Sequence, residues 1–299
     1  MTRNALDLPV DSIPSGELSQ SWWLEPFGLT PEAALRYWRA NLPHGFVAKG
    51  AGLTRMNRPL PLGRQEPRAI LLCHPSEGLG LAAAIRVTDA GNELFGIWPV
   101  ISHGVQHRVV PERLVLSEDR LQAYVVATLG EVLELCYFDP LFIPDRGFYA
   151  ADCAMEIILC GVAHRFEIIE PEPIFLGPEA ESYEALVRAG PEAVGEDGRI
   201  RFETKGMAAI FPLTGTSRNA YEFRGPVLGV RKLMLDLGGH PVWMVRVAVA
   251  RIGEEMADVM IDFAVTDLTL PETGLPEVGQ DVAGAAVLYG TVWSAQAGA

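Results

Sequence analysis

The stretch VWMVRVAVARIGEEMADVMIDF, residues 242–263, decides the fold class. Its first part is an apolar run that Arg246 and Arg251 interrupt, and in its second part apolar residues alternate with polar ones up to Asp262. Alternation with a period of two is typical of a half-buried strand, and Glu254-Glu255 suits the tip of a hairpin. We therefore predict two antiparallel strands over 241–252 and 256–264, with Asp262 on the polar face.

Similar runs occupy most of the chain and are separated by turn signals such as Asp89-Ala90-Gly91-Asn92. The other expected strands cover residues 68–74, 80–87, 93–101, 105–110, 121–129, 131–138, 153–169, 199–203, 221–236 and 281–293. A helix is expected to begin at Pro31, because Thr30 suits the N-cap position and proline suits the first helical position. Pro43 ends it, and a second short helix is expected near 179–189. The predicted fold is mainly β.

A spaced triplet of residues occurs twice. Its members are separated by seven and then two positions and are Asp152, Leu159 and Gly161 in the first copy and Asp281, Leu288 and Gly290 in the second. The offset of 129 residues also carries Arg68, where β structure begins, close to Arg199, where it resumes. We therefore predict a tandem duplication of a small antiparallel domain, either a barrel or a sandwich. Each repeat glycine is expected to mark a β-bulge that bends the last strand.

The duplication divides the chain into four parts. An N-terminal arm with a helix and a basic loop covers residues 1–67, and the first β domain covers 68–172. An acidic, partly helical linker covers 173–198, and the second β domain covers 199–299. This division predicts two similar units in which the two triplets superpose.

Charge is segregated along the sequence, although the net charge of the chain is −14. Residues 36–68 carry a net charge of +6, and residues 167–197 carry −8. The basic segment mixes positive charge with aromatic residues, which suits an anionic ligand or single-stranded nucleic acid, whereas a solvated loop is the plainer interpretation. The candidate contact residues for a partner or an anion are Arg36, Arg39, Lys49, Arg55, Arg58 and Arg64, together with Trp22 and Trp23. The two tryptophans could instead anchor the arm in the protein's own core.

Composition excludes several classes of protein. The first residues are polar, unlike a signal peptide, and no apolar run approaches the roughly 20 residues of a membrane helix. We therefore expect a cytoplasmic protein without a membrane partner, in which all four cysteines are reduced. The strongly negative net charge disfavours a general nucleic-acid binder.

No motif for catalysis, a metal or a cofactor is present in the sequence. The histidines and cysteines lack zinc-ligand spacing, so we expect no metal and no cofactor. The leading hypothesis is a non-catalytic interaction or assembly protein that contacts another protein chain or itself. A binder of an anionic ligand or single-stranded nucleic acid through residues 36–68 is the alternative, and an enzyme with an unrecognised site comes third.

Overall fold

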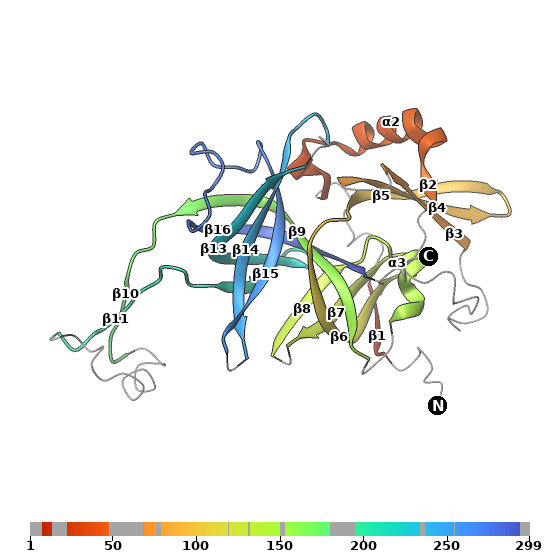
Figure 1. Cartoon of the computed structure of the whole chain (residues 1–299). Helices are drawn as coiled ribbons and strands as arrows, with labels where there is room; N and C mark the ends of the chain where they lie inside the picture. Colours follow the sequence, from red (N-terminus) through yellow and green to blue (C-terminus); the bar gives the residue numbers. More distant parts are fainter. Residues whose placement is uncertain are drawn as a thin grey trace, which may run out of the picture.

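The structure is a computed structural model of the whole chain (Figure 1). It describes residues 8–13, 23–47, 68–75, 79–118, 120–130, 132–149, 153–179, 195, 197–233, 237–253 and 255–293. Over these residues the fold is mainly β, as predicted, with a ten-stranded sheet, a four-stranded sheet and a two-stranded sheet. Several strands were missed by the sequence patterns because they are short: β1 (Val10–Ile13), β10 (Ile174–Leu176) and β12 (Ala209–Pro212).

The predicted helix is confirmed as α2 (Pro31–Asn41), which lies above the four-stranded sheet in Figure 1. The Thr30 hydroxyl accepts a hydrogen bond from the backbone N–H of Ala33 at 3.2 Å, which is N-capping. Ala34 and Trp38 form its buried face. Short 3-10 turns precede and follow it, η3 (Glu25–Phe27) and η4 (Leu42–His44). The second predicted helix, near 179–189, falls almost entirely outside the described residues.

The smaller sheet has the order β2-β3-β4-β5 and consists of consecutive antiparallel neighbours. Its strands are β2 (Phe46–Val47), β3 (Arg68–His74), β4 (Leu79–Thr88) and β5 (Gly91–Ile101). Strand β2 comes from the predicted N-terminal arm, and the other three belong to the sequence range of the predicted first β domain, yet the four form a sheet separate from the strands that follow them.

The large sheet runs in the order β1-β6-β7-β8-β16-β9-β15-β14-β13-β12. Its longer strands are β6 (Val105–Ser117), β7 (Ala123–Leu129), β8 (Leu133–Phe138), β9 (Met155–Ile169), β13 (Ala220–Lys232), β14 (Val242–Ile252), β15 (Ala257–Thr266) and β16 (Asp281–Val292). A helical turn α3 (Phe142–Asp145) and a 3-10 turn η5 (Arg146–Phe148) separate β8 from β9. The sheet therefore unites strands from both predicted β domains.

The pairing pattern of the first four long strands recurs in the last four. Antiparallel pairs join β6 to β7, β7 to β8 and β9 to β6, and likewise β13 to β14, β14 to β15 and β16 to β13. Strand β8 then runs parallel to β16, and β15 runs parallel to β9. The pairs form two closed circuits, β6-β7-β8-β16-β9 and β13-β14-β15-β9-β16, which share the antiparallel pair β9–β16.

The predicted hairpin is present as β14 and β15, but the prediction for Asp262 is wrong. Its side chain is 2% exposed, although the alternation placed it on the polar face. The reason is that both faces of this part of the sheet are covered. One apolar core takes side chains such as Val247 and Phe263 from one face, and a second takes Met244 and Ala264 from the other.

The second core fills the space between the large sheet, the smaller sheet and the N-terminal segment. Trp98 of β5 packs edge-on against Phe138 of β8, with ring centroids 5.7 Å apart. Trp23, immediately before η3, is 1% exposed, and its ring lies 4.4 Å from that of Phe138. Phe138 thus lies beneath both tryptophans.

The repeat glycines do not mark bulges, so that expectation is wrong. The register shift between β9 and β16 occurs at Ala285 and Ala286 instead. A Cβ atom at Gly161 would lie 2.6 Å from Cε1 of Phe263, and one at Gly290 would lie 2.6 Å from Cε2 of Tyr137. Glycine is needed at both positions because an aromatic ring from a neighbouring strand, β15 for Gly161 and β8 for Gly290, lies against the backbone there.

Candidate functional site

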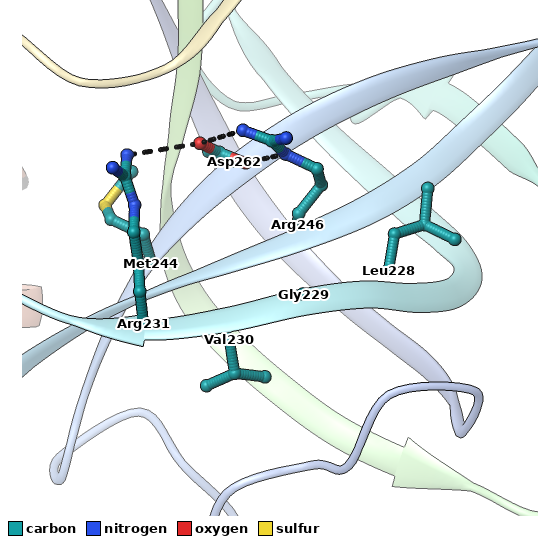
Figure 2. A pocket seen from close by; sticks show the side chains of 7 residues that line it. All are labelled: Leu228, Gly229, Val230, Arg231, Met244, Arg246 and Asp262. Atoms are coloured by element: carbon teal, nitrogen blue, oxygen red, sulfur yellow. Dashed lines mark hydrogen bonds and ion pairs between the residues drawn. The ribbon is translucent and has the colours of Figure 1, made fainter.

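A groove of about 250 Å³ opens over strands β13, β14 and β15, and Figure 2 shows the side chains that line it. The lining residues are Leu228, Gly229, Val230, Arg231, Met244, Arg246 and Asp262. The groove therefore combines an apolar wall with one carboxylate and two guanidinium groups.

The carboxylate of Asp262 lies between the two arginines (Figure 2). Arg246 donates from Nε to Oδ1 at 2.7 Å and from Nη2 to Oδ2 at 3.1 Å, which makes a bidentate pair. Arg231 donates from Nη2 to Oδ2 at the longer distance of 3.4 Å. The hydrogen bond to Asp262 raises the pKa of Arg246 above its ordinary value, so the guanidinium remains charged.

Burial differs sharply between the three charged groups. Asp262 is almost fully buried, whereas the side chains of Arg246 and Arg231 are 41% and 48% exposed. A buried carboxylate needs a partner, because the cost of removing it from water is several kcal/mol. Arg246 supplies that partner through two hydrogen bonds, and both guanidinium groups still face the groove.

Strand register creates the room above these groups. Gly229 of β13 pairs with Arg246 of β14, which pairs in turn with Asp262 of β15. A Cβ atom at Gly229 would meet only the Cβ atom of Arg246, at 3.9 Å, an ordinary van der Waals contact. The absence of a side chain at residue 229 thus leaves space beside Arg246.

The same positions in the first circuit are filled with uncharged side chains. Cys160 pairs with Asp262, and Tyr289, which lies 129 residues later, pairs with Phe138. Phe138 is therefore the counterpart of Asp262. By the same pairings Tyr124 is the counterpart of Arg246, and Val115 is the counterpart of Gly229. Val115, Tyr124 and Phe138 are all buried.

A second feature is the ribbon formed by β10 and β11 (Ile200–Phe202), which projects from the body on the left of Figure 1. The two strands pair antiparallel, with Ile174 opposite Phe202 and Phe175 opposite Arg201. Ile174 and Phe202 are exposed, and Phe175 is 55% exposed. Among the described strands, β10 and β11 pair only with each other.

The candidate partner or anion residues are only partly placed by the structure. Arg36 and Arg39 are exposed on α2. Trp23 lies in the protein's own core, which corresponds to the anchoring alternative. The remaining candidates lie outside the described residues: Trp22, Lys49, Arg55, Arg58 and Arg64.

The repeat residues lie at the centre of the molecule. Leu159 pairs with Gly290, and Gly161 pairs with Leu288, so the two copies face each other across the β9–β16 pair. Asp281, at the start of β16, is buried and accepts a hydrogen bond from the backbone N–H of Gly206 at 2.9 Å. Asp152 lies outside the described residues.

A buried acid elsewhere has an altered pKa. Burial raises the pKa of Asp139 to about 7, although the Tyr149 hydroxyl donates to Oδ2 at 2.6 Å and the backbone N–H of Leu141 donates to Oδ1 at 2.8 Å. Asp139 is 1% exposed, so it cannot contact a substrate in this conformation. We interpret this cluster as part of the core.

Two histidines form hydrogen bonds within the fold, and the cysteines form no disulfide. His107 bonds the backbone carbonyl of Met260 through Nε2 at 2.8 Å, and the Nδ1 atom of His74 lies 2.7 Å from the Tyr37 hydroxyl. The four cysteines are free thiols. In the described part of the chain, no three metal-ligating side chains gather into a group. Over the same residues, no helix is both long enough and apolar enough to cross a membrane.

Sequence reasoning missed the arginine–aspartate cluster although a signal was present. Arg246 interrupts an apolar run, which indicates a special role for that position. A regular hairpin with its tip at Glu254-Glu255 would have paired Arg246 with Phe263. A register shift between Ala248 and Ala250 moves the pairing by one residue and brings Arg246 opposite Asp262. Comparison with protein-family models, curated proteins and solved structures found no match to this chain.

Proposed function

We propose that this chain is a non-catalytic assembly protein that associates with a second copy of itself through the β10–β11 ribbon. The single observation that carries the proposal is the exposure of Ile174, Phe175 and Phe202 on a projecting two-stranded ribbon. An isolated two-stranded ribbon is marginally stable in water, and three or more strands or packing against another element are needed to secure it. A second chain commonly supplies the missing strands by adding its own strand to a free sheet edge.

The sequence of the ribbon suits pairing with its own copy. Arg201 and Glu203 flank Phe202, and their side chains form an exposed ion pair of 2.8 Å. If β11 of one copy pairs antiparallel with β11 of another around Phe202, Arg201 of each copy lies opposite Glu203 of the other. The two phenylalanines then face each other, and a two-fold axis makes both contacts identical. A four-stranded sheet results.

We also propose that the two circuits are small closed barrels that arose by duplication. Their pairings correspond strand for strand, with the same antiparallel and parallel directions. The registers correspond too, since Cys160 and Tyr289 pair at the centre of β9–β16 and each repeat leucine pairs with the repeat glycine of the other copy. A two-fold axis relating the duplicated units accounts for the pairing of each repeat leucine with the repeat glycine of the other copy.

The measurement is the mass in solution over a wide range of protein concentrations. We expect a dimer that dissociates on dilution, and a monomer when Phe175 and Phe202 are both replaced by serine. Val132→Ser is the matched control, since Val132 is also strongly exposed but lies in the turn between β7 and β8. A wild-type protein that stays monomeric at every concentration, or a ribbon variant that still dimerises, excludes this assembly.

Binding of an anionic ligand through residues 36–68 remains the second candidate function. The observation in its favour is that Arg36 and Arg39 are exposed on the same helix. Salt-sensitive binding of an oligonucleotide that Arg36→Gln weakens would support it, and binding that is insensitive to this substitution would count against it.

A further inference from the structure

The groove over β13, β14 and β15 contains more positive charge than its buried carboxylate requires. Arg246 already occupies both oxygens of Asp262 with two hydrogen bonds. Arg231 adds a third contact at 3.4 Å, beyond the 2.7–2.9 Å usual for charge-assisted bonds. Three charged groups therefore leave a net charge of +1 in the groove of a chain whose net charge is −14.

The fold itself does not require charged residues at these positions. In the first circuit the counterparts of Arg246 and Asp262 are Tyr124 and Phe138, both buried, and the rings of Trp23 and Trp98 pack against Phe138. Replacing a buried ion pair by apolar side chains of similar volume is often neutral or stabilising. The first circuit thus shows within one molecule that uncharged residues are accommodated at the positions of Arg246 and Asp262. The charged set in the second circuit calls for a reason other than stability.

Access to the charges depends on one further difference between the circuits. Gly229 stands where the first circuit has the buried Val115. The missing side chain leaves the guanidinium groups of Arg231 and Arg246 facing a space of about 250 Å³. This volume lies just below the usual range for ligand pockets and suits a small molecule. Leu228, Val230 and Met244 supply the apolar part of the lining.

We propose that this groove binds a small organic anion through a carboxylate or phosphate group, with Arg231 as the clamp. Guanidinium groups bind both kinds of oxyanion with two parallel hydrogen bonds. Asp262 and Arg246 form the rigid base of the site, because their bidentate pair fixes the Arg246 side chain. A positive groove on a negative molecule also concentrates anions locally. The proposal is independent of assembly through the ribbon.

Calorimetric titration at low salt tests the site with three probes: succinate, inorganic phosphate and the uncharged succinamide. We expect one equivalent of succinate or phosphate to bind and succinamide not to bind. Arg231→Gln is expected to weaken binding about tenfold or more, since a hydrogen bond between charged groups is lost. Tighter binding of succinate than phosphate identifies the ligand group as a carboxylate, and the reverse order identifies it as a phosphate.

Two further variants separate loss of the site from loss of the fold. Gly229→Val restores the residue of the first circuit and fills the groove without removing a charge, so it is expected to abolish binding while the melting temperature holds. Arg108→Gln removes an exposed arginine outside the groove and is expected to bind like the wild type. The proposal is overturned if neither anion binds the wild type at millimolar concentration. It is also overturned if the Arg231 and Gly229 variants bind as tightly as the wild type.

Discussion

Replacing either repeat glycine by alanine tests the central packing of the molecule. At Gly161 the added Cβ atom would lie 2.6 Å from Cε1 of Phe263, and at Gly290 it would lie 2.6 Å from Cε2 of Tyr137. Both distances are far below van der Waals contact, and both rings belong to fully buried side chains. Overpacking of this kind costs about 1–3 kcal/mol, although alanine itself recovers about 0.5–1 kcal/mol in a strand.

We therefore expect each variant to lose roughly 1–2 kcal/mol of unfolding free energy and to melt about 2–8 °C lower. The two losses should be similar, because the two contacts are equally close. Gly229→Ala is the matched control, since its Cβ atom has space, and it should be about 0.5–1 kcal/mol more stable than the wild type. Chemical denaturation and calorimetry provide the measurements.

A double-mutant cycle connects the loss to the ring. Phe263→Leu removes the contacting ring atoms, so Gly161→Ala should cost at least about 0.5 kcal/mol less in that background. The same leucine substitution should leave the cost of Gly290→Ala unchanged, because Tyr137 is the ring at that position. An alanine at Gly161 that costs nothing, or that costs equally in both backgrounds, would refute the packing argument.

Two other predictions concern buried charge. Burial raises the pKa of Asp139 from 3.8 to about 7, so the folded protein retains a proton that the unfolded chain releases. Protonated Asp139 therefore stabilises the folded protein below about pH 4, and on the order of 4 kcal/mol of this stability is lost as the pH rises to about 7. Denaturation of Asp139→Asn across this range should show a flatter pH dependence than that of the wild type. Arg246→Met should destabilise the protein by about 3 kcal/mol, since it leaves Asp262 without its main partner, and adding Asp262→Leu should restore most of the loss. Thermal melts of the single and double variants check this, and a double variant no more stable than Arg246→Met contradicts it.

Local patterns in the sequence predicted local structure well. The Thr30-Pro31 start of α2 and a strand over residues 256–264 were confirmed, because both predictions depend on residues close in sequence. The burial of Asp262 could not be predicted, since the side chains on its carboxylate come from two other strands, Arg231 of β13 and Arg246 of β14. A bulge of one residue decides whether Arg246 meets Asp262 or Phe263, and no sequence pattern located it.

The repeat shows the same limit on a larger scale. The shared spacing of Leu159–Gly161 and Leu288–Gly290 predicts two separate, similar units. It did not indicate that the two stretches pair with each other. Spacing gives the periodicity of a strand and carries no information on which strand lies beside it, because the partner is chosen by the packing of the whole sheet.

The shared pair β9–β16 also determines how the chain can fold. Strand β8 is completed by β16, and the two strands meet at Phe138 and Tyr289, which are about 150 residues apart. Until β16 has been synthesised, β8 keeps an open edge beside an unfinished core, and such edges promote aggregation. The first circuit can therefore close only after nearly the whole chain has been synthesised, and long-range pairing of this kind makes folding slow. A nascent chain that ends before Asp281 therefore exposes the edge of β8 that β16 covers in the folded protein.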